Sequence, residues 1–169
     1  MRLKIIILFL FLLIVVFRPC LNCTIAQDNK ARLDKIYSAA LFYIIKFCKF
    51  ESIQDSEINI CFNGSPTESF KTTFNNKSIN GKNILLESSI DSKCDLIYYS
   101  NTNQLPTNNE LQKFPDSITV SDSSDFLEKG GFIQLGEENN KLKIFLNSQK
   151  IDAIKKVVSS DLLAIAEIK

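Results

Sequence analysis

Residues 121–147 read SDSSDFLEKGGFIQLGEENNKLKIFLN, and the local signals in this stretch decide the fold of the chain around it. Asp122–Lys129 has the composition of a helical turn, and two of the five glycines of the chain follow it. We expect Gly130 to end the turn in left-handed backbone geometry, which glycine adopts without steric cost. We expect Gly131 to lead into a strand through a corner that has no space for a side chain.

The rest of the stretch predicts an antiparallel hairpin. Phe132–Glu137 and Lys141–Asn147 are strand-like runs, and the polar residues Glu138-Asn139-Asn140 lie between them. A phosphate-binding loop is the alternative interpretation of the glycine pair. Such a loop needs more glycines, or a Lys-Ser/Thr pair that opens a long helix, whereas this pair leads into a strand. The sequence therefore favours a structural turn at Gly130 and Gly131.

Helical and strand-like segments alternate along the rest of the chain. Helices are predicted at 30–48, 67–74, 107–114, 148–157 and 160–168, and further strands at 57–62, 83–88, 93–100 and 117–121. Asn80-Gly81 predicts a turn. This order predicts an α/β fold, a layered domain with a largely parallel sheet flanked by helices and a C-terminal antiparallel hairpin.

The N-terminus has the pattern of a secretory signal. Ile5–Phe17 is an uninterrupted apolar run, shorter than the roughly 20 residues that span a bilayer. Thr24-Ile25-Ala26 offers small residues for cleavage, so we expect residues 1–26 to be a signal peptide. Residues 27–169 then form a single exported, periplasmic domain that begins at Gln27. An uncleaved membrane anchor is the alternative, and lipid attachment is a weaker one, because neither of the first two cysteines follows a small residue.

Composition excludes several classes of function. The chain has 169 residues, 20 basic and 19 acidic side chains, and no histidine. Without residues 1–26 it keeps 17 basic and 19 acidic side chains, a charge of −2 that offers no footprint for nucleic acid. The missing histidine excludes Ser-His and Cys-His nucleophiles and removes the commonest metal ligand. The carboxylate clusters, Glu137-Glu138 and Asp122 with Asp125, lie at predicted turns and caps, so we expect no enzyme, no cofactor and no metal site.

Three cysteines follow the predicted signal peptide: Cys48, Cys61 and Cys94. Cys48 lies on an apolar stripe at helical spacing, so we expect it to be a buried free thiol. The stripe consists of Leu33, Ile36, Tyr37, Ala40, Leu41, Ile44, Ile45 and Cys48. Cys61 and Cys94 lie on two predicted strands, and export favours a disulfide between them, which would stabilise the fold by roughly 3–4 kcal/mol. A metal site is the alternative, for which two cysteines without histidine are a poor ligand set.

Three aromatic residues, Phe42, Tyr43 and Phe47, lie beside this stripe on the first predicted helix. They form a surface for a partner or for a second copy of the chain, or they fill a small core. The sequence leaves both interpretations open.

A series of motifs in the second half of the chain carries a family resemblance. They are Thr119-Val120-Ser121-Asp122, Phe126, Gly130-Gly131-Phe132-Ile133, Leu135, Asn140, Leu142-Lys143, Leu146-Asn147, Ser159-Ser160, Leu162-Leu163 and Ala166, preceded by Ile60-Cys61-Phe62-Asn63-Gly64 and Cys94-Asp95-Leu96-Ile97-Tyr98. In order and spacing, over residues 35–166, these motifs resemble the YfiR family of small periplasmic proteins. The chain departs from the family pattern at Ile144-Phe145 and at Phe50-Glu51-Ser52, and it has no second cysteine pair near the glycines.

The resemblance implies regulation. Relatives in this family are periplasmic repressors that bind the periplasmic sensor part of an inner-membrane diguanylate cyclase and hold it inactive. An outer-membrane lipoprotein can sequester the repressor, which raises cyclic di-GMP and promotes biofilm formation, and the family's cysteines link stability to the redox state of the envelope. We therefore expect a repressor whose partners are such a membrane protein, the lipoprotein and a second copy of the chain.

Small-molecule binding is the alternative function. Parallel α/β sheets bind ligands at the carboxyl ends of their strands, which in this chain lie near Asn63-Gly64 and Tyr99-Ser100. A ligand-binding module of this kind would act by delivering its ligand to a membrane receptor.

Overall fold

The computed structural model describes residues 21–50 and 56–169. The chain divides into two compact units, Met1–Leu33 and Asp34–Lys169. The described part of the first unit is helical throughout. The apolar run of the predicted signal peptide lies outside the described residues, and cleavage before Gln27 stays a prediction. Within the described residues, no helix combines the length and the apolar character needed to cross a membrane.

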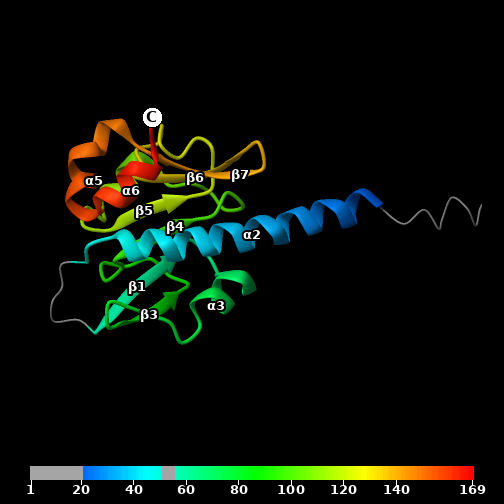
Figure 1. The fold of residues 1–169 in the computed structure, drawn as a ribbon, viewed down its shortest axis with the longest axis horizontal. Coiled ribbons are helices and arrows are strands. Elements are labelled where there is room, and N and C mark those ends of the chain that lie inside the picture. The colour runs from blue at the N-terminus through cyan, green and yellow to red at the C-terminus, as the bar shows by residue number, and fades with distance from the viewer. Residues whose placement is uncertain (1–20, 51–55) are drawn as a thin grey trace, which may run out of the picture. The chain divides into compact units, whose positions relative to one another are not determined.

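One eight-stranded sheet, in the order β2-β3-β1-β4-β5-β6-β7-β8, forms the framework of the second unit (Figure 1). Its strands are β1 Glu57–Phe62, β2 Ser78–Ile79, β3 Lys82–Glu87, β4 Leu96–Tyr99, β5 Ile118–Ser121, β6 Ile133–Glu138, β7 Lys141–Leu146 and β8 Glu167–Ile168. The central strands run parallel, from β3 through β1, β4 and β5 to β6. The hairpin of β6 and β7 is antiparallel, so the predicted α/β class is confirmed.

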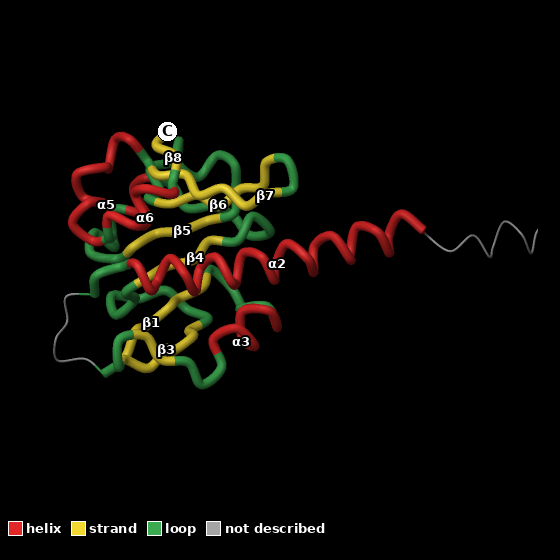
Figure 2. The backbone as a smooth tube through the Cα atoms, viewed as in Figure 1, coloured by secondary structure: helices red, strands yellow, loops and turns green. Residues whose placement is uncertain are grey.

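The helices occupy most of the predicted segments (Figure 2). They are α2 Leu21–Phe47, α3 Glu68–Phe74, α4 Asn108–Leu111, the 3-10 turn η1 Ser148–Lys150, α5 Ile151–Val157 and α6 Ser160–Ile165. Helix α4 begins with a complete capping box between Thr107 and Glu110, and it ends earlier than predicted. The cause is Pro115, which disfavours helical geometry at the residue before it.

The last predicted helix is wrong at its end. Helix α6 ends at Ile165, and Glu167 and Ile168 form β8, which pairs with the outer edge of β7. The backbone of Lys169 completes this pairing, because its N–H donates to Leu146 and its carbonyl oxygen accepts from Ser148. The open edge of β7 offers backbone hydrogen-bond partners to Glu167 and Ile168, and a further turn of α6 would have left that edge unpaired.

The principal core lies between the sheet and its helices, on what we call the helical face. From Asp34 onward, α2 lies across the strands on the near side in Figure 1, and α3 lies beside it. The predicted stripe is buried from Tyr37 to Cys48, whereas Leu33 and Ile36 are partly exposed. Backbone hydrogen bonds from Lys49 to Val157 and from Ser159 to Phe47 join the end of α2 to α5 and α6.

A smaller core lies on the opposite side of the sheet, which we call the disulfide face. It consists of Cys61, Cys94, Ile97, Tyr99, Leu111 and Phe126, with Ile90, Leu105 and Phe114 packed around it. Among the described residues, those that complete this core beside the strands come from the short helix α4 and from loops. Side chains that alternate along β1 and β4 therefore supply both cores.

Candidate functional site

The sheet changes its direction of growth between β1 and β4. From β1 the chain passes through α3 to β3 on one side, and it then returns to β4 on the other side. Loops that leave the carboxyl ends of two such strands diverge, and doubly wound proteins bind ligands in the crevice between them. A pocket of about 150 Å³ lies at this point, lined by Asn63 and Gly64 from one loop and by Ser100, Thr102 and Asn103 from the other.

The sequence predicted a crevice near Asn63-Gly64 and Tyr99-Ser100, and the structure places a hollow at each pair. Tyr99 lines a separate hollow of about 300 Å³ together with Ile90 and Glu110, while Ser100 lines the 150 Å³ pocket. The difference follows from strand alternation, because Tyr98 faces the helical side of the sheet and Tyr99 the disulfide face.

Hydrogen bonds fix the rim of the 150 Å³ pocket. The side-chain amide of Asn103 donates to the carbonyl oxygen of Asn63, and the amide of Asn63 donates to the carbonyl oxygen of Gln104 at 2.8 Å. Gly64 makes this close approach feasible, because a Cβ atom there would lie 2.7 Å from the Asn103 amide nitrogen. The two loops are thus held together without a ligand, and the pocket is preformed.

Three aromatic residues form the floor of the pocket. The rings of Phe62, Phe70 and Tyr98 form a triad with centroid separations of 5.2, 5.6 and 4.9 Å. They come from β1, α3 and β4, and each is buried. The floor of the pocket is therefore apolar, while hydroxyl and amide groups form the rim.

Negative charge gathers at this pocket. Asp34 of α2 lines it, and none of the described residues that line it is basic. Asp122 lies next to Tyr98, which hydrogen-bonds to its carboxylate, and the backbone N–H of Asn101 donates to the same group at 2.7 Å. Burial raises the pKa of Tyr98, and the charges of Asp122, Tyr37 and Asp34 raise it further. Tyr98 is therefore a neutral hydrogen-bond donor.

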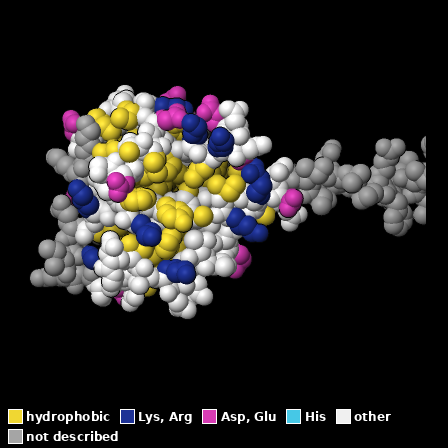
Figure 3. Space-filling view, in the orientation of Figure 1, with side chains coloured by type: hydrophobic (Ala, Val, Ile, Leu, Met, Phe, Trp, Pro, Cys, Tyr) yellow, Lys and Arg dark blue, Asp and Glu magenta, His cyan; other side chains and the backbone are white. Residues whose placement is uncertain are grey.

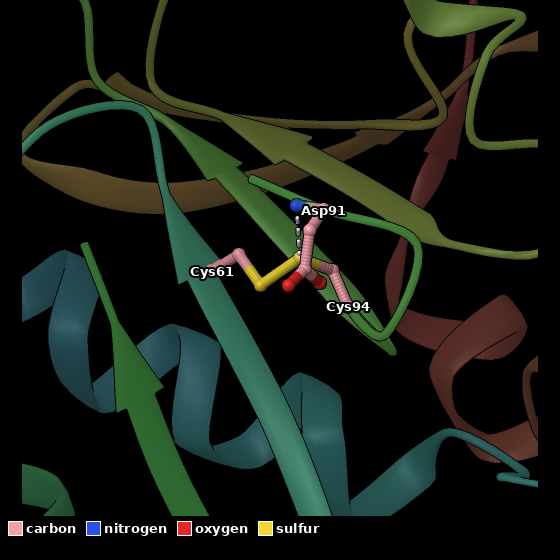
Figure 4. Close-up of side chains that lie close together, drawn as sticks. All are labelled: Cys61, Asp91 and Cys94. Atoms are coloured by element: carbon pink, nitrogen blue, oxygen red, sulfur yellow. Dashed lines mark hydrogen bonds between the residues drawn. A yellow bond between two sulfur atoms is a disulfide. The ribbon is translucent and has the colours of Figure 1, made fainter. Parts of the chain in front are cut away.

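The predicted disulfide joins Cys61 of β1 to Cys94, which lies in the turn just before β4 (Figure 4). The two strands are neighbours, so the Cα atoms are 5.7 Å apart and meet without displacement of the backbone. The backbone N–H of Asp91 donates to Cys94 Sγ at 3.3 Å, and Ser117 Oγ donates to the carbonyl oxygen of Cys94 at 2.6 Å. These contacts fix the turn that carries the second cysteine.

The disulfide lines an open hollow of about 810 Å³ at the amino-terminal side of β4. Asp91 lies close enough to Cys61 and Cys94 for the three side chains to suggest a metal site. Metals bind cysteine as thiolate, and the sulfurs of an intact disulfide are not thiolates. The group therefore does not fit a metal while the bond is present.

The glycine pair has the geometry that the sequence predicts. Gly130 has a φ of +89°, in the left-handed region, and a Cβ atom on Gly131 would lie 2.1 Å from the ring of Phe126. Asn147, at the end of the hairpin, is buried and donates to the carbonyl oxygens of Leu127 and Gly131 at 3.0 and 2.9 Å. The turn is thus a structural feature that covers the disulfide face.

The aromatic residues of α2 divide between core and surface. Phe42 packs against Phe74 of α3 with 5.8 Å between ring centroids, and Phe47 is also half-buried. Tyr43 is 59% exposed, with the ammonium of Lys46 at 5.8 Å from its ring. Apolar side chains are visible across the α2 side of the molecule (Figure 3). Of the three aromatic residues, Tyr43 is therefore the one whose side chain is mostly exposed.

The carboxylate clusters have structural partners. Asp125 contacts Lys129 at 2.8 Å and accepts from Ser123 at 2.5 Å, and these hydrogen bonds lower the pKa of Asp125 to about 2. Glu138 lies 3.9 Å from Lys143 across the hairpin. These contacts agree with the prediction of turn and cap roles.

Sequence reasoning missed Asp34, which lines the pocket, Asp122, which lies beside it, and Asn147, which holds the turn at the glycine pair. Asp122 was read only as a turn residue, yet it reaches Tyr98 and Asn101 at the carboxyl end of β4. Asn147 was noted only as part of a motif. A polar residue directly after a buried strand is the signal that could have marked Asp122 and Asn147.

Comparison with known protein families gives one match. The profile of the YfiR/HmsC-like family matches residues 34–167, nearly the whole of the second unit. No curated protein matches the chain.

Proposed function

Because the chain belongs to the YfiR/HmsC-like family, we propose that it acts in the periplasm, where it binds the sensor part of an inner-membrane diguanylate cyclase and represses the enzyme. The family is a regulatory one and not an enzyme family. The observation that carries the proposal is the extent of the match, since residues 34–167 include seven of the eight strands in full and the first residue of β8.

Three further features support the proposal. The apolar run at the N-terminus has the pattern of an export signal, and the Cys61–Cys94 disulfide suits an oxidising compartment. Tyr43 offers an exposed aromatic side chain of the type that is enriched at protein interfaces. In the proposed pathway an outer-membrane lipoprotein relieves the repression, and a homodimer of the chain is an additional assembly to test.

The test is a deletion of the gene in its host, followed by measurement of cyclic di-GMP by mass spectrometry. Loss of a repressor should raise cyclic di-GMP and biofilm formation, and the full chain supplied from a plasmid should restore both. A chain that lacks residues 1–26 should stay in the cytoplasm and fail to restore them. Unchanged cyclic di-GMP after deletion, or full rescue by the truncated chain, would contradict the proposal.

The partner is tested by capture from detergent-solubilised membranes with the chain as bait. A membrane cyclase should be recovered with the wild-type chain and recovered less with Tyr43→Asp. Glu68→Lys is the matched control, because it places a charge change on the exposed surface of α3. Equal recovery with all three chains would show that Tyr43 lies outside the interface.

Small-molecule binding is a second candidate function. The specific observation in its favour is the preformed pocket at the carboxyl ends of β1 and β4. A ligand there need not exclude a protein partner on α2, so the two functions are compatible.

A further inference from the structure

The pocket between the loops that follow β1 and β4 has three properties that together select a ligand. It is small, it joins an apolar floor to a hydrogen-bonding rim, and its only charged lining residue among those described is an acid. None of these properties depends on the family to which the chain belongs.

Size limits the ligand first. The pocket has a volume of about 150 Å³. Pockets for drug-sized ligands are at least about twice as large. The occupant is therefore a metabolite of only several non-hydrogen atoms, and a nucleotide or a peptide does not fit.

Charge limits it next. Asp34 contributes a carboxylate from α2, and it lines the pocket together with Phe62, Phe70 and Tyr98. Asp122 adds a second carboxylate behind Tyr98. An anionic ligand would meet Asp34 and no basic side chain among the described lining residues, so the site disfavours phosphate and carboxylate ligands.

The floor and the rim complete the selection. The triad of Phe62, Phe70 and Tyr98 lies under the pocket, and aromatic rings beside a carboxylate attract ammonium groups, including quaternary ones. Ser100 and Thr102, whose hydroxyl oxygens lie 3.0 Å apart, supply hydrogen-bonding groups at the mouth for a hydroxyl or a second amine on the ligand.

We propose that this pocket binds a small organic ammonium ion, with the cationic group between Asp34 and the aromatic triad and the polar end of the ligand at Ser100 and Thr102. The loops already hold one another through Asn63 and Asn103, so binding requires little ordering of the chain. This site goes beyond the proposed repression of a cyclase and does not depend on it.

The test uses the purified full chain and choline as the probe, followed by two-dimensional NMR of the backbone amides. We expect saturable shifts confined to Asp34 and its neighbours in α2, residues 62–70 and residues 98–103, with a dissociation constant of about 1 mM for so small a ligand. The matched control is 3,3-dimethylbutan-1-ol, which has the shape of choline without its charge, and it should bind at least about tenfold more weakly. Acetate should produce no shifts in these residues.

Variants locate the site. Asp34→Asn keeps the shape of the side chain and removes its charge, so choline binding should weaken by about tenfold. Asp116→Asn is the control, because it removes an exposed acid that lines the hollow beside the disulfide and should leave binding unchanged. Thr102→Tyr places a larger side chain at an exposed position of the rim and should abolish binding in a chain that stays folded by circular dichroism.

Four results would overturn the proposal. They are the absence of shifts up to about 20 mM choline, shifts centred on other residues, equal binding of choline and its neutral analogue, and equal binding by Asp34→Asn and the wild type. The experiment contains no cyclase. Failure here therefore leaves the proposed repression standing, and failure of the cyclic di-GMP test leaves this binding result standing.

Discussion

The two faces of the sheet are stabilised in different ways. On the helical face, α2 and α3 cover the strands with buried aliphatic and aromatic side chains, among them Ile44 and Phe74. On the disulfide face a four-residue helix and loops cover a core of six fully buried residues, two of which are the bridged cysteines. Where few apolar side chains are available, a covalent bond and buried polar contacts replace hydrophobic burial.

The buried polar groups follow the same division. Ser117, Thr119 and Asn147 all donate or accept hydrogen bonds that fix loops of the disulfide face, to Cys94, to Phe132 and to Leu127 with Gly131. Among the described residues, no buried side-chain nitrogen or oxygen atom lacks a hydrogen-bond partner. The comparison teaches that hydrophobic periodicity determines the helical face, whereas individual polar contacts determine the disulfide face.

The largest effect is expected from a charge on the helical face. Ile44 is fully buried in α2, so Ile44→Asp leaves an unpaired carboxylate in the core and should cost more than about 4 kcal/mol, enough to unfold most of the protein. The measurement is far-ultraviolet circular dichroism with urea unfolding. The neighbouring change Tyr43→Asp is the control, because Tyr43 is exposed and should shift the free energy of unfolding by less than about 1 kcal/mol. Equal loss of structure in both variants would show that α2 is buried on all sides.

Loss of the disulfide should be the largest change available on the other face. The bond spans 33 residues of sequence, so Cys61→Ser with Cys94→Ser should lower the free energy of unfolding by about 2–4 kcal/mol. The measurement is urea unfolding of the double variant against the wild type in the absence of reductant. Peptide mapping of unreduced protein provides the control, and it should recover Cys61 and Cys94 in one linked pair with Cys48 free. A different pairing would contradict the structure.

The sequence predicted the helical face of the sheet better than the disulfide face. Alternating patterns and helical stripes predicted six of the eight strands, all but β2 and β8, and the burial from Tyr37 to Cys48, because burial imposes those periods directly. The run after Asp122 was predicted as a helical turn, and it forms hydrogen-bonded turns that include a bond from the Lys129 N–H to the Asp125 carbonyl oxygen, but the Asn147 side chain that holds the carbonyl oxygens of Leu127 and Gly131 was not predicted. Such partners are distant in sequence, so no local pattern reveals them.

The candidate ligand site shows the same limit. The rule for parallel sheets located the carboxyl ends of β1 and β4 from Asn63-Gly64 and Ser100. It did not supply Asp34, which comes from a helix far upstream in the sequence, or Asp122, which comes from the neighbouring strand end. The order of the parallel strands therefore predicts where the pocket lies. The acidic residues in and beside it become visible only once the tertiary contacts are known.

Smaller changes in the glycine pair separate backbone geometry from packing. Gly131→Ala places a Cβ atom against the buried ring of Phe126 and should cost about 1–3 kcal/mol through overpacking. Gly130→Ala introduces left-handed strain and meets only the side chain of Asn108, so it should cost about 1 kcal/mol. Thermal unfolding of both variants provides the measurement. A larger cost at Gly130 than at Gly131 would show that Phe126 moves aside and that backbone strain dominates.

The smallest predicted effect concerns Cys48, the buried thiol of the helical face, and it appears only at high pH. Burial raises the pKa of Cys48 from 9.0 to about 12, so the folded protein keeps the thiol protonated where the unfolded chain loses its proton. The contribution of this group to stability is therefore fully present below pH 9 and is lost as the pH rises between 9 and 12. Cys48→Ala removes the titration, although it also costs about 1 kcal/mol of packing at all pH values. The unfolding free energy of the wild type should therefore fall by about 1.4 kcal/mol relative to that of Cys48→Ala between pH 8 and pH 10, so that the variant becomes slightly the more stable of the two at pH 10. Other groups that titrate in this range cancel, because both proteins contain them.

In parallel, iodoacetamide should modify Cys48 at pH 8 only after urea is added, since the thiolate is the reactive form. A difference that does not change with pH, or rapid modification of the folded protein, would place Cys48 in contact with solvent and separate it from the buried stripe.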